Sequence, residues 1–341
     1  MYQRTCYAFT CIFLCSTLAA AAELRVITDR TTSHIRPIIE QFEAESRTKV
    51  SVLYVKKGFL QRVKSRPSEA DVIFTKNLEQ LATLGKQGKI APFKSEKIKK
   101  NVAHKFIDKD NFFLATSYRV RAIYADKNFK LPDNFDYDYL AEPSLKGSVC
   151  MRSGYHEYNL SLFSQLRLKW GKNKFKIFIR GLKANLARKP KGNDRAQVEA
   201  IIKKICKVAI ANSYYHGIMQ GNPKQKIWAD GTAVYFPDQG GLGSQVLLSG
   251  AAITKGKNQN KATKLLEFLV TEKIQKFFTR HLHSYSVLKQ ETELSQHNKT
   301  LGKQQKQVQN GVFKINSIPL EKTSQERLAI LKVLNDVKFD E

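Results

Sequence analysis

The sequence predicts an α/β protein with two lobes, and three observations lead to this fold class. Short apolar segments alternate with amphipathic helical segments between residues 24 and 75. The same alternation recurs between residues 147 and 237. The chain has 341 residues, a length that favours two domains over one. We therefore expect a mainly parallel sheet with helices on its faces in each lobe.

The first lobe begins with a β-α-β-α-β pattern. Apolar residues recur every three or four positions after the first strand, which predicts a helix. Pro37 fits the first turn of that helix, where its missing N–H is not needed. The expected strands are 24–28, 49–55 and 70–75, and the expected helices are 33–46 and 59–66.

The second lobe repeats this alternation with longer helices. Asp194 stands where it would cap a helix that carries Val198 and Ile201 on one face. The expected strands are 147–153, 207–213 and 232–237, and the expected helices are 159–171, 175–187 and 192–204. Two further amphipathic helices are expected near the end of the chain, at 260–282 and 324–337.

Residues 1–22 have the pattern of a secretory signal peptide. Arg4 precedes an apolar segment, and four alanines follow at a suitable cleavage site near Ala22. A membrane anchor is the alternative, although the apolar segment is short for one. We therefore exclude residues 1–22 from the fold and expect an exported protein.

Export also determines how the cysteines are interpreted. Cys6, Cys11 and Cys15 would leave with the signal peptide, so Cys150 and Cys206 remain. An even number of cysteines in an oxidising compartment suggests a disulfide. Two buried free thiols are the alternative.

The chain is strongly basic, with 58 Lys and Arg against 30 Asp and Glu and a formal charge of +28. Such an excess can mark a protein that binds nucleic acid or another polyanion. Here the basic residues are spread along the chain in stretches such as 94–100 and 171–176. We therefore interpret the charge as a general surface property and expect no nucleic-acid partner. An exported basic protein that binds polyanions, such as nucleic acid or a surface polysaccharide, remains an alternative.

Three tyrosines follow predicted strands of the second lobe. Tyr214 and Tyr215 come directly after strand 207–213, and Tyr158 follows strand 147–153 by a few residues. Ligands of open parallel sheets bind outside the carboxyl ends of the strands, so the three phenols are expected to converge. The alternative is that each tyrosine is an ordinary core or surface residue.

Converging phenols favour a hard, highly charged cation. A free phenol has a pKa of about 10 and needs such a cation to ionise at neutral pH. Oxygen donors suit hard ions, and tyrosine is an iron ligand in proteins. Three phenolates would balance Fe(III) in charge, whereas zinc favours Cys and His ligands.

Four stretches resemble the periplasmic ferric-ion-binding proteins, the substrate-binding components of iron(III) ABC transporters. These are "VCMRSGYHEYNLSLF", "GLKANLARKPKGNDRAQVEAI", "CKVAIANSYYHGIM" and "VYFPDQGG". The resemblance implies the type II periplasmic-binding-protein fold, in which two α/β lobes surround a cleft and are joined by crossing hinge strands. On this basis we expect lobe 1 to comprise 23–118 and 245–295, and lobe 2 to comprise 119–244 and 296–341.

The resemblance also implies a site. Tyr158, Tyr214 and Tyr215 match tyrosine ligands of the family, and carbonate or another synergistic anion often completes the coordination. The positions that match the anion-binding shell are Arg121, Ser153, Gly154, Asn193 and Asn212. A surface role is the alternative for Arg121.

The first lobe departs from the family pattern. Thr31 and Thr32 stand where members usually have His or His-Tyr, and His34 follows one turn later as a candidate displaced ligand. A helix-terminal histidine that binds no metal is the alternative. Lys76 stands where another branch has glutamate, and it would repel a ferric ion unless it points away or meets the anion.

The sequence thus predicts a monomeric, non-enzymatic periplasmic protein. It would capture Fe(III) through tyrosine phenolates and deliver it to an inner-membrane ABC permease. A protein of the same fold that binds a phosphate- or carboxylate-bearing organic solute is the main alternative.

Overall fold

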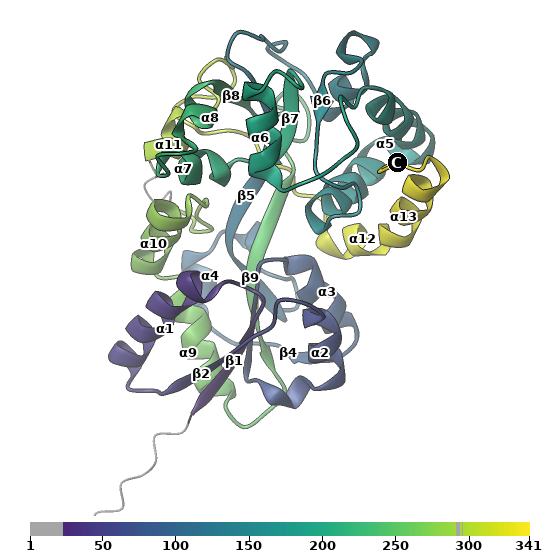
Figure 1. The fold of residues 1–341 in the computed structure, drawn as a ribbon. Helices are drawn as coiled ribbons and strands as arrows, with labels where there is room; N and C mark the ends of the chain where they lie inside the picture. Colours follow the sequence, from purple (N-terminus) through teal and green to yellow (C-terminus); the bar gives the residue numbers. More distant parts are fainter. Residues whose placement is uncertain (1–22, 291–293, 295) are drawn as a thin grey trace, which may run out of the picture.

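The computed structural model describes residues 23–290, 294 and 296–341. Figure 1 shows two α/β lobes, one above the other, joined by the long strands β5 (Phe113–Asp126) and β9 (Val246–Thr254). The predicted signal peptide lies outside the described residues. Within those residues, no helix combines the length and apolarity needed to cross a membrane.

Lobe 1 has the predicted β-α-β-α-β start. Its parallel strands have the order β2-β1-β3. The strands are β1 (Leu24–Thr28), β2 (Val50–Tyr54), β3 (Val72–Thr75) and β4 (Ile90–Ala91). The helices are α1 (Thr32–Ser46), α2 (Phe59–Ser65), α3 (Leu78–Lys86), α4 (Glu96–Asn101), α9 (Gln259–Leu269) and α10 (Glu272–Leu282), with short 3-10 turns at Pro67–Glu69 and His104–Phe106.

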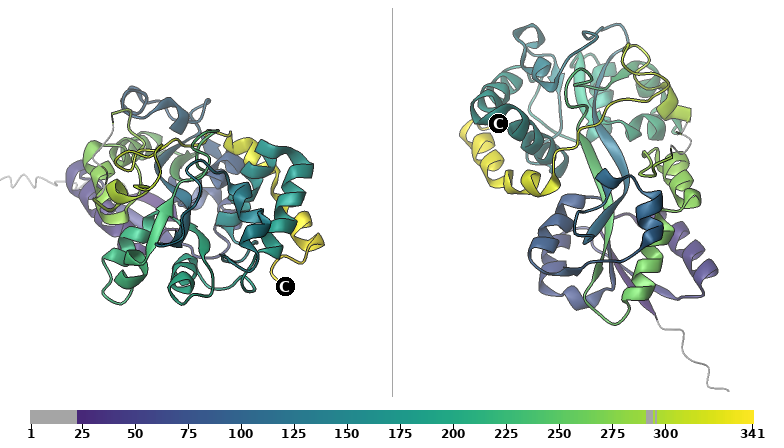
Figure 2. Two further views of the ribbon diagram at one scale, coloured as in Figure 1. Left: turned by 90° about the horizontal axis from the view of Figure 1, so that it is seen from above. Right: turned by 180° about the vertical axis from the view of Figure 1, so that it is seen from behind.

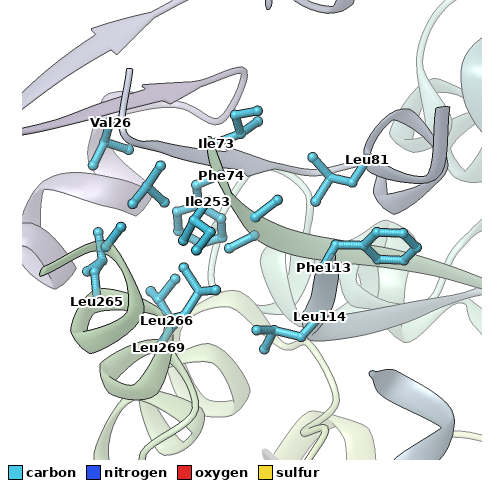
Figure 3. Packing of buried hydrophobic residues seen from close by; sticks show 14 of the residues in the cluster. Val26, Ile73, Phe74, Leu81, Phe113, Leu114, Ile253, Leu265, Leu266 and Leu269 are labelled. Atoms are coloured by element: carbon cyan, nitrogen blue, oxygen red, sulfur yellow. The ribbon is translucent and has the colours of Figure 1, made fainter. Parts of the chain in front are cut away.

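The core of lobe 1 lies between this sheet and its helices. The apolar spacing of α1 buries Ile35, Ile38 and Phe42. Figure 3 shows Leu266 and its neighbours on α9 pointing toward Phe74 of the sheet. The helical period of these residues therefore places one face of each helix on the sheet.

The predicted helix 260–282 is two helices, α9 and α10. The helix is interrupted between Leu269 and Glu272. The side chain of Thr271 accepts a hydrogen bond from the Ile274 N–H and so caps α10. The threonine side chain takes a backbone N–H that a helical carbonyl would otherwise bind, and so one helix ends and a second begins.

Strands β5 and β9, the crossing strands, join the lobes. They pair antiparallel from Phe113 opposite Ala252 to Val120 opposite Val246. Beyond Val120, β5 pairs with strands of lobe 2. The view from behind in Figure 2 shows both strands running between the lobes. The precise lobe boundaries stay a prediction.

Lobe 2 contains the remaining strands of the sheet, which has the order β2-β1-β3-β9-β5-β7-β6 with β8 on β5. Its strands are β6 (Val149–Cys150), β7 (Val208–Asn212) and β8 (Thr232–Tyr235). Its helices are α5 (Glu157–Ala184), α6 (Asp194–Ile202), α7 (Tyr214–Gln220), α8 (Lys226–Asp230), α11 (Gln296–Thr300), α12 (Leu320–Gln325) and α13 (Arg327–Asp336), with 3-10 turns at Tyr137–Ala141 and Pro143–Leu145.

Two elements of lobe 2 differ from the prediction. The strand expected at 147–153 is only β6, because the chain turns after Cys150 toward the start of α5. The two helices expected at 159–171 and 175–187 form α5, which is interrupted at Gly171, a residue with φ of 79°.

The expected disulfide between Cys150 and Cys206 is present, with sulfurs 2.10 Å apart. Cys150 ends β6, and Cys206 lies two residues before β7, which pairs with β6 in parallel. The bond therefore ties together the strands that precede Tyr158 and Tyr214.

Candidate functional site

Tyr158, Tyr214 and Tyr215 line one cavity of about 390 Å³ between the lobes, here called the tyrosine cavity. Tyr158 lies in the first turn of α5, and His156 caps this helix by accepting the Tyr158 N–H. Tyr214 and Tyr215 open α7 directly after β7. The structure thus brings the three predicted tyrosines together at the carboxyl end of β7.

The paired phenols are close to each other and sheltered from water. The ring centroids of Tyr214 and Tyr215 are 4.1 Å apart. Burial and the proximity of Tyr158 raise the pKa of Tyr214 well above its usual range. The same causes raise the pKa of Tyr215 to about 12. Both side chains are therefore neutral at ordinary pH unless a cation stabilises their phenolates.

Three guanidinium groups surround the ring of Tyr158. The Cζ atoms of Arg119, Arg121 and Arg152 lie 5.5, 5.8 and 5.3 Å from its centroid. Cations at such distances are attracted to the ring face. This arrangement fixes Tyr158 in a positively charged environment.

Arg30 and Arg119 both line the cavity and are here called the cationic wall; Arg119 also lies against the ring of Tyr158. Each donates a hydrogen bond of 2.8 Å to the Oγ of Ser249 on β9. Arg119 also donates to the carbonyl of Lys76. Burial, and after it the charge of the neighbouring Arg119, lower the pKa of Arg30 to about 10. Two like charges held this close favour an anion in the cavity.

Asp29, His34 and Lys76 complete the lobe 1 side of the cavity. The Asp29 carboxylate accepts the backbone N–H of Lys76 at 2.8 Å. Burial lowers the pKa of His34, and the charge of Arg30 acts in the same direction. Lys76 lines this cavity and also the neighbouring one formed with Phe59 and Arg327, so both expected roles of its ammonium group stay predictions.

Sequence reasoning missed Asp29, Arg30 and Arg119. The first two directly follow β1, at a strand end where ligands of such sheets gather. That position was a usable signal. No comparable signal marks Arg119, because an arginine within a strand does not show on which face of the sheet its side chain lies.

The five predicted anion-binding residues lie outside the described lining of this cavity. Arg121 is fully buried and donates to Asp194 and Asn159, both at 2.7 Å, and to Asn212 at 3.3 Å. The others are hydrogen-bonded elsewhere: Asn193, and not Asp194 as predicted, caps α6, the Gly154 N–H donates to the distant Asp340, and Ser153 Oγ accepts the Tyr155 N–H. Their anion role stays a prediction, and Arg30, Arg119 and Arg195 are the arginines that line the cavity.

Residues 24–281 match the family model of bacterial extracellular solute-binding proteins. Iron uptake protein A1 of Synechocystis sp. is 33% identical over 273 residues, which cover 78% of this chain and 76% of that protein. The chain belongs to the periplasmic ferric-ion-binding proteins. The family resemblance of the sequence is thereby confirmed.

Solved structures of ferric-ion-binding proteins have the same fold. Apo ferric ion-binding protein A of Pasteurella haemolytica is 37% identical, with a TM-score of 0.83 and coverage of 94% of this chain and 98% of that one. A Trichodesmium protein in complex with iron and citrate ligands is 26% identical, with a TM-score of 0.84 and coverage of 93% and 100%. These likenesses confirm the predicted type II fold with two lobes.

Proposed function

We propose that this ferric-ion-binding protein captures Fe(III) in the periplasm through Tyr158, Tyr214 and Tyr215 and delivers it to an inner-membrane ABC permease. The observation that carries the proposal is the convergence of three phenols in one cavity between two lobes. Phenolate oxygens are hard donors, and three of them balance the charge of a ferric ion.

Capture requires Tyr214 and Tyr215 to lose protons that their raised pKa values make hard to remove. The raised pKa values of Tyr214 and Tyr215 mean that a weakly charged cation gains little there. A ferric ion replaces the protons because its charge stabilises the phenolates directly. Affinity therefore falls as pH falls, since protons and iron compete for the same oxygens.

A synergistic anion, carbonate or a small carboxylate such as citrate, completes the site. Four cationic side chains line the cavity, namely Arg30, Lys76, Arg119 and Arg195, against the single carboxylate of Asp29. These cations would repel an unaccompanied ferric ion, whereas an anion bound to it satisfies them. His34 faces the same space and remains a candidate ligand from lobe 1.

Iron loading of the purified protein tests the proposal. Protein loaded with ferric citrate should turn orange-red through phenolate-to-iron charge transfer. Tyr215→Phe should weaken or shift this band. Tyr139→Phe, whose ring packs against Phe135 within lobe 2, is the matched control and should leave it unchanged. A colourless wild-type protein would contradict the iron assignment.

The cationic wall favours a second candidate, an organic anion bound without metal. Arg30 and Arg119 lie side by side at the cavity and would hold a carboxylate or phosphate by charge-assisted hydrogen bonds. Calorimetry with metal-free citrate and with inorganic phosphate distinguishes the two functions. Tight binding of either without iron supports this second candidate.

A further inference from the structure

Among the described residues that line the tyrosine cavity, Asp29 is the only acid. It directly follows β1, and the parallel strand β3 ends beside it at Thr75. Asp29 therefore lies at the carboxyl ends of the lobe 1 strands, where ligands of such sheets bind. Tyr158, Tyr214 and Tyr215 line the same cavity from lobe 2. One carboxylate from lobe 1 and three phenols from lobe 2 thus border one space.

The two oxygens of the Asp29 carboxylate have different surroundings. Oδ1 accepts the backbone N–H of Lys76 at 2.8 Å, which ties the end of β1 to the end of β3. Oδ2 accepts no hydrogen bond from the described chain, and it is not one of the fully buried oxygens that lack a partner. Asp29 borders the tyrosine cavity and also the neighbouring cavity formed with Phe59 and Arg327, so a bound group can reach Oδ2.

The cations of the cavity leave this carboxylate without a counter-ion. Arg30 and Arg119 each donate to Ser249 Oγ at 2.8 Å, and Arg119 also donates to the Lys76 carbonyl. Within the described chain, no basic side chain forms an ion pair with Asp29, which is 8% exposed. A nearly buried carboxylate without a counter-ion gains free energy when a cation binds, because burial removes much of the water that would stabilise its charge.

The carboxylate also suits a ferric ion better than the other lobe 1 groups at the cavity do. It is a hard, negatively charged oxygen donor, as the phenolates are. The ammonium group of Lys76 and the guanidinium group of Arg30 have no lone pair to donate. His34 can offer only a neutral nitrogen donor, which adds no negative charge to the site.

We propose that Asp29 is the lobe 1 ligand of the ferric ion. Its Oδ2 binds the metal that the three phenolates hold from lobe 2, and the anion that accompanies the metal meets Arg30 and Arg119. The hydrogen bond of Oδ1 fixes the carboxylate to the ends of β1 and β3. A metal held from both lobes draws them together, so capture drives closure. This role of Asp29 rests on the proposed function and adds to it the group that couples capture to closure.

Affinity for the ferric ion tests the role of the charge. Asp29→Asn keeps an oxygen that can accept the Lys76 N–H but loses the negative charge. Its affinity, measured by competition with a chelator of known affinity, should be at least about tenfold weaker than that of wild type. Asp110→Asn removes the charge of an exposed acid of lobe 1 and should change nothing. Thermal melting shows whether both variants fold, and a smaller loss in folded Asp29→Asn overturns the proposal.

Small-angle X-ray scattering separates a metal ligand from a residue that only supports the site. Wild-type protein should become more compact when it is loaded with iron and carbonate. Asp29→Asn at saturating iron should keep the phenolate-to-iron colour, since its three tyrosines are intact, yet remain as extended as the iron-free protein. Full compaction of the iron-loaded variant, or none in wild type, would overturn the coupling of capture to closure.

A measurement on the wild-type protein does not depend on whether a variant folds. Protein grown on aspartate labelled with ¹³C in its side-chain carboxyl group is loaded with iron and unlabelled carbonate. Electron–nuclear double resonance should then detect ¹³C coupled to the ferric ion. Iron uptake without this coupling overturns the role of Asp29 alone, whereas a wild-type protein that takes up no iron overturns the proposed function together with it.

Discussion

The two walls of the tyrosine cavity differ in chemistry. Lobe 2 contributes three phenols, two of which have raised pKa values, Tyr214 and Tyr215, and it also contributes Arg195 of α6. Lobe 1 and β5 contribute Arg30, Lys76 and Arg119, which are positive from the start. Under the proposed function, the side rich in phenols would hold the metal, and the more cationic side would hold the anion that accompanies it. Closure of the lobes would then bring the cationic side chains of lobe 1 to the anion that accompanies the metal on lobe 2.

The lobes also differ in how their strands are held. In lobe 2 a disulfide ties β6 to the segment before β7, so the strands that position the tyrosines are fixed covalently. Among the described residues of lobe 1, the strand ends that carry Asp29 and Lys76 are held by backbone pairing and by hydrogen bonds such as that between these two residues.

Removal of the disulfide should give the largest effect. Cys150 and Cys206 are 56 residues apart, and a loop of this length stabilises a fold by about 4 kcal/mol in the chain-entropy model. Substitution of both cysteines by serine should lower the free energy of unfolding of lobe 2 by about this amount. Both tryptophans, Trp170 and Trp228, lie in lobe 2, so their fluorescence in urea reports this lobe.

The reduced wild-type protein is the control for the disulfide variant. Reduction and the double substitution should give the same denaturation midpoint. Equal stability of the oxidised protein and the variant would show that the bond does not hold the metal-binding wall in place.

Loss of one paired phenol should give the next largest effect. Tyr214→Phe removes a negatively charged ligand and should weaken ferric-ion affinity at least about 100-fold, since a charged ligand contributes several kcal/mol. Competition with a chelator of known affinity measures it. Tyr139→Phe should leave the affinity unchanged, and a loss equal to that of Tyr214→Phe would argue for a general effect on lobe 2.

The convergence of the three tyrosines was predictable from the sequence because its cause is local. The apolar run before Tyr214 predicts a strand, and a residue at the end of such a strand lies at the edge of the sheet where ligands bind. Tyr158 follows β6 in the same way, although β6 is shorter than its apolar pattern suggested.

The Arg119 side of the cationic wall was not predictable, because its placement has no local cause. Arg30 and Arg119 are 219 and 130 positions from Ser249, which holds both. Arg119 and Arg121 share one face of β5, yet two residues along the strand place Arg121 against Asp194 in the core. Local sequence around these two arginines cannot show which of them meets the cavity.

Neutralising Arg119 tests whether the cationic wall holds the anion that accompanies the ferric ion. Arg119→Gln should make ferric-ion affinity nearly independent of added carbonate and about tenfold weaker in its presence, because the anion loses a charged partner. Arg36→Gln, on the exposed face of α1, is the control. An unaltered response to carbonate would mean that Arg119 only supports the fold through Ser249.

The smallest expected effect concerns the contact between α3 of lobe 1 and α5 of lobe 2, here called the seam. Glu79 of α3 accepts a hydrogen bond from Ser161 of α5, and burial raises its pKa from 4.5 to about 7. The folded protein therefore holds this proton more tightly than the unfolded chain does. Its stabilising effect is complete below pH 4.5 and is lost as pH rises through about 7.

Glu79→Gln should abolish this pH dependence, because glutamine stays neutral and keeps an oxygen for Ser161. At pH 8 the variant should be about 1 to 2 kcal/mol more stable than wild type, less than the full shift implies because the side chain is partly exposed to water. Near pH 4 the two urea denaturation curves should coincide, which serves as the internal control. A constant difference at both pH values would show that Glu79 acts through packing and not through its charge, and that the seam does not respond to protons.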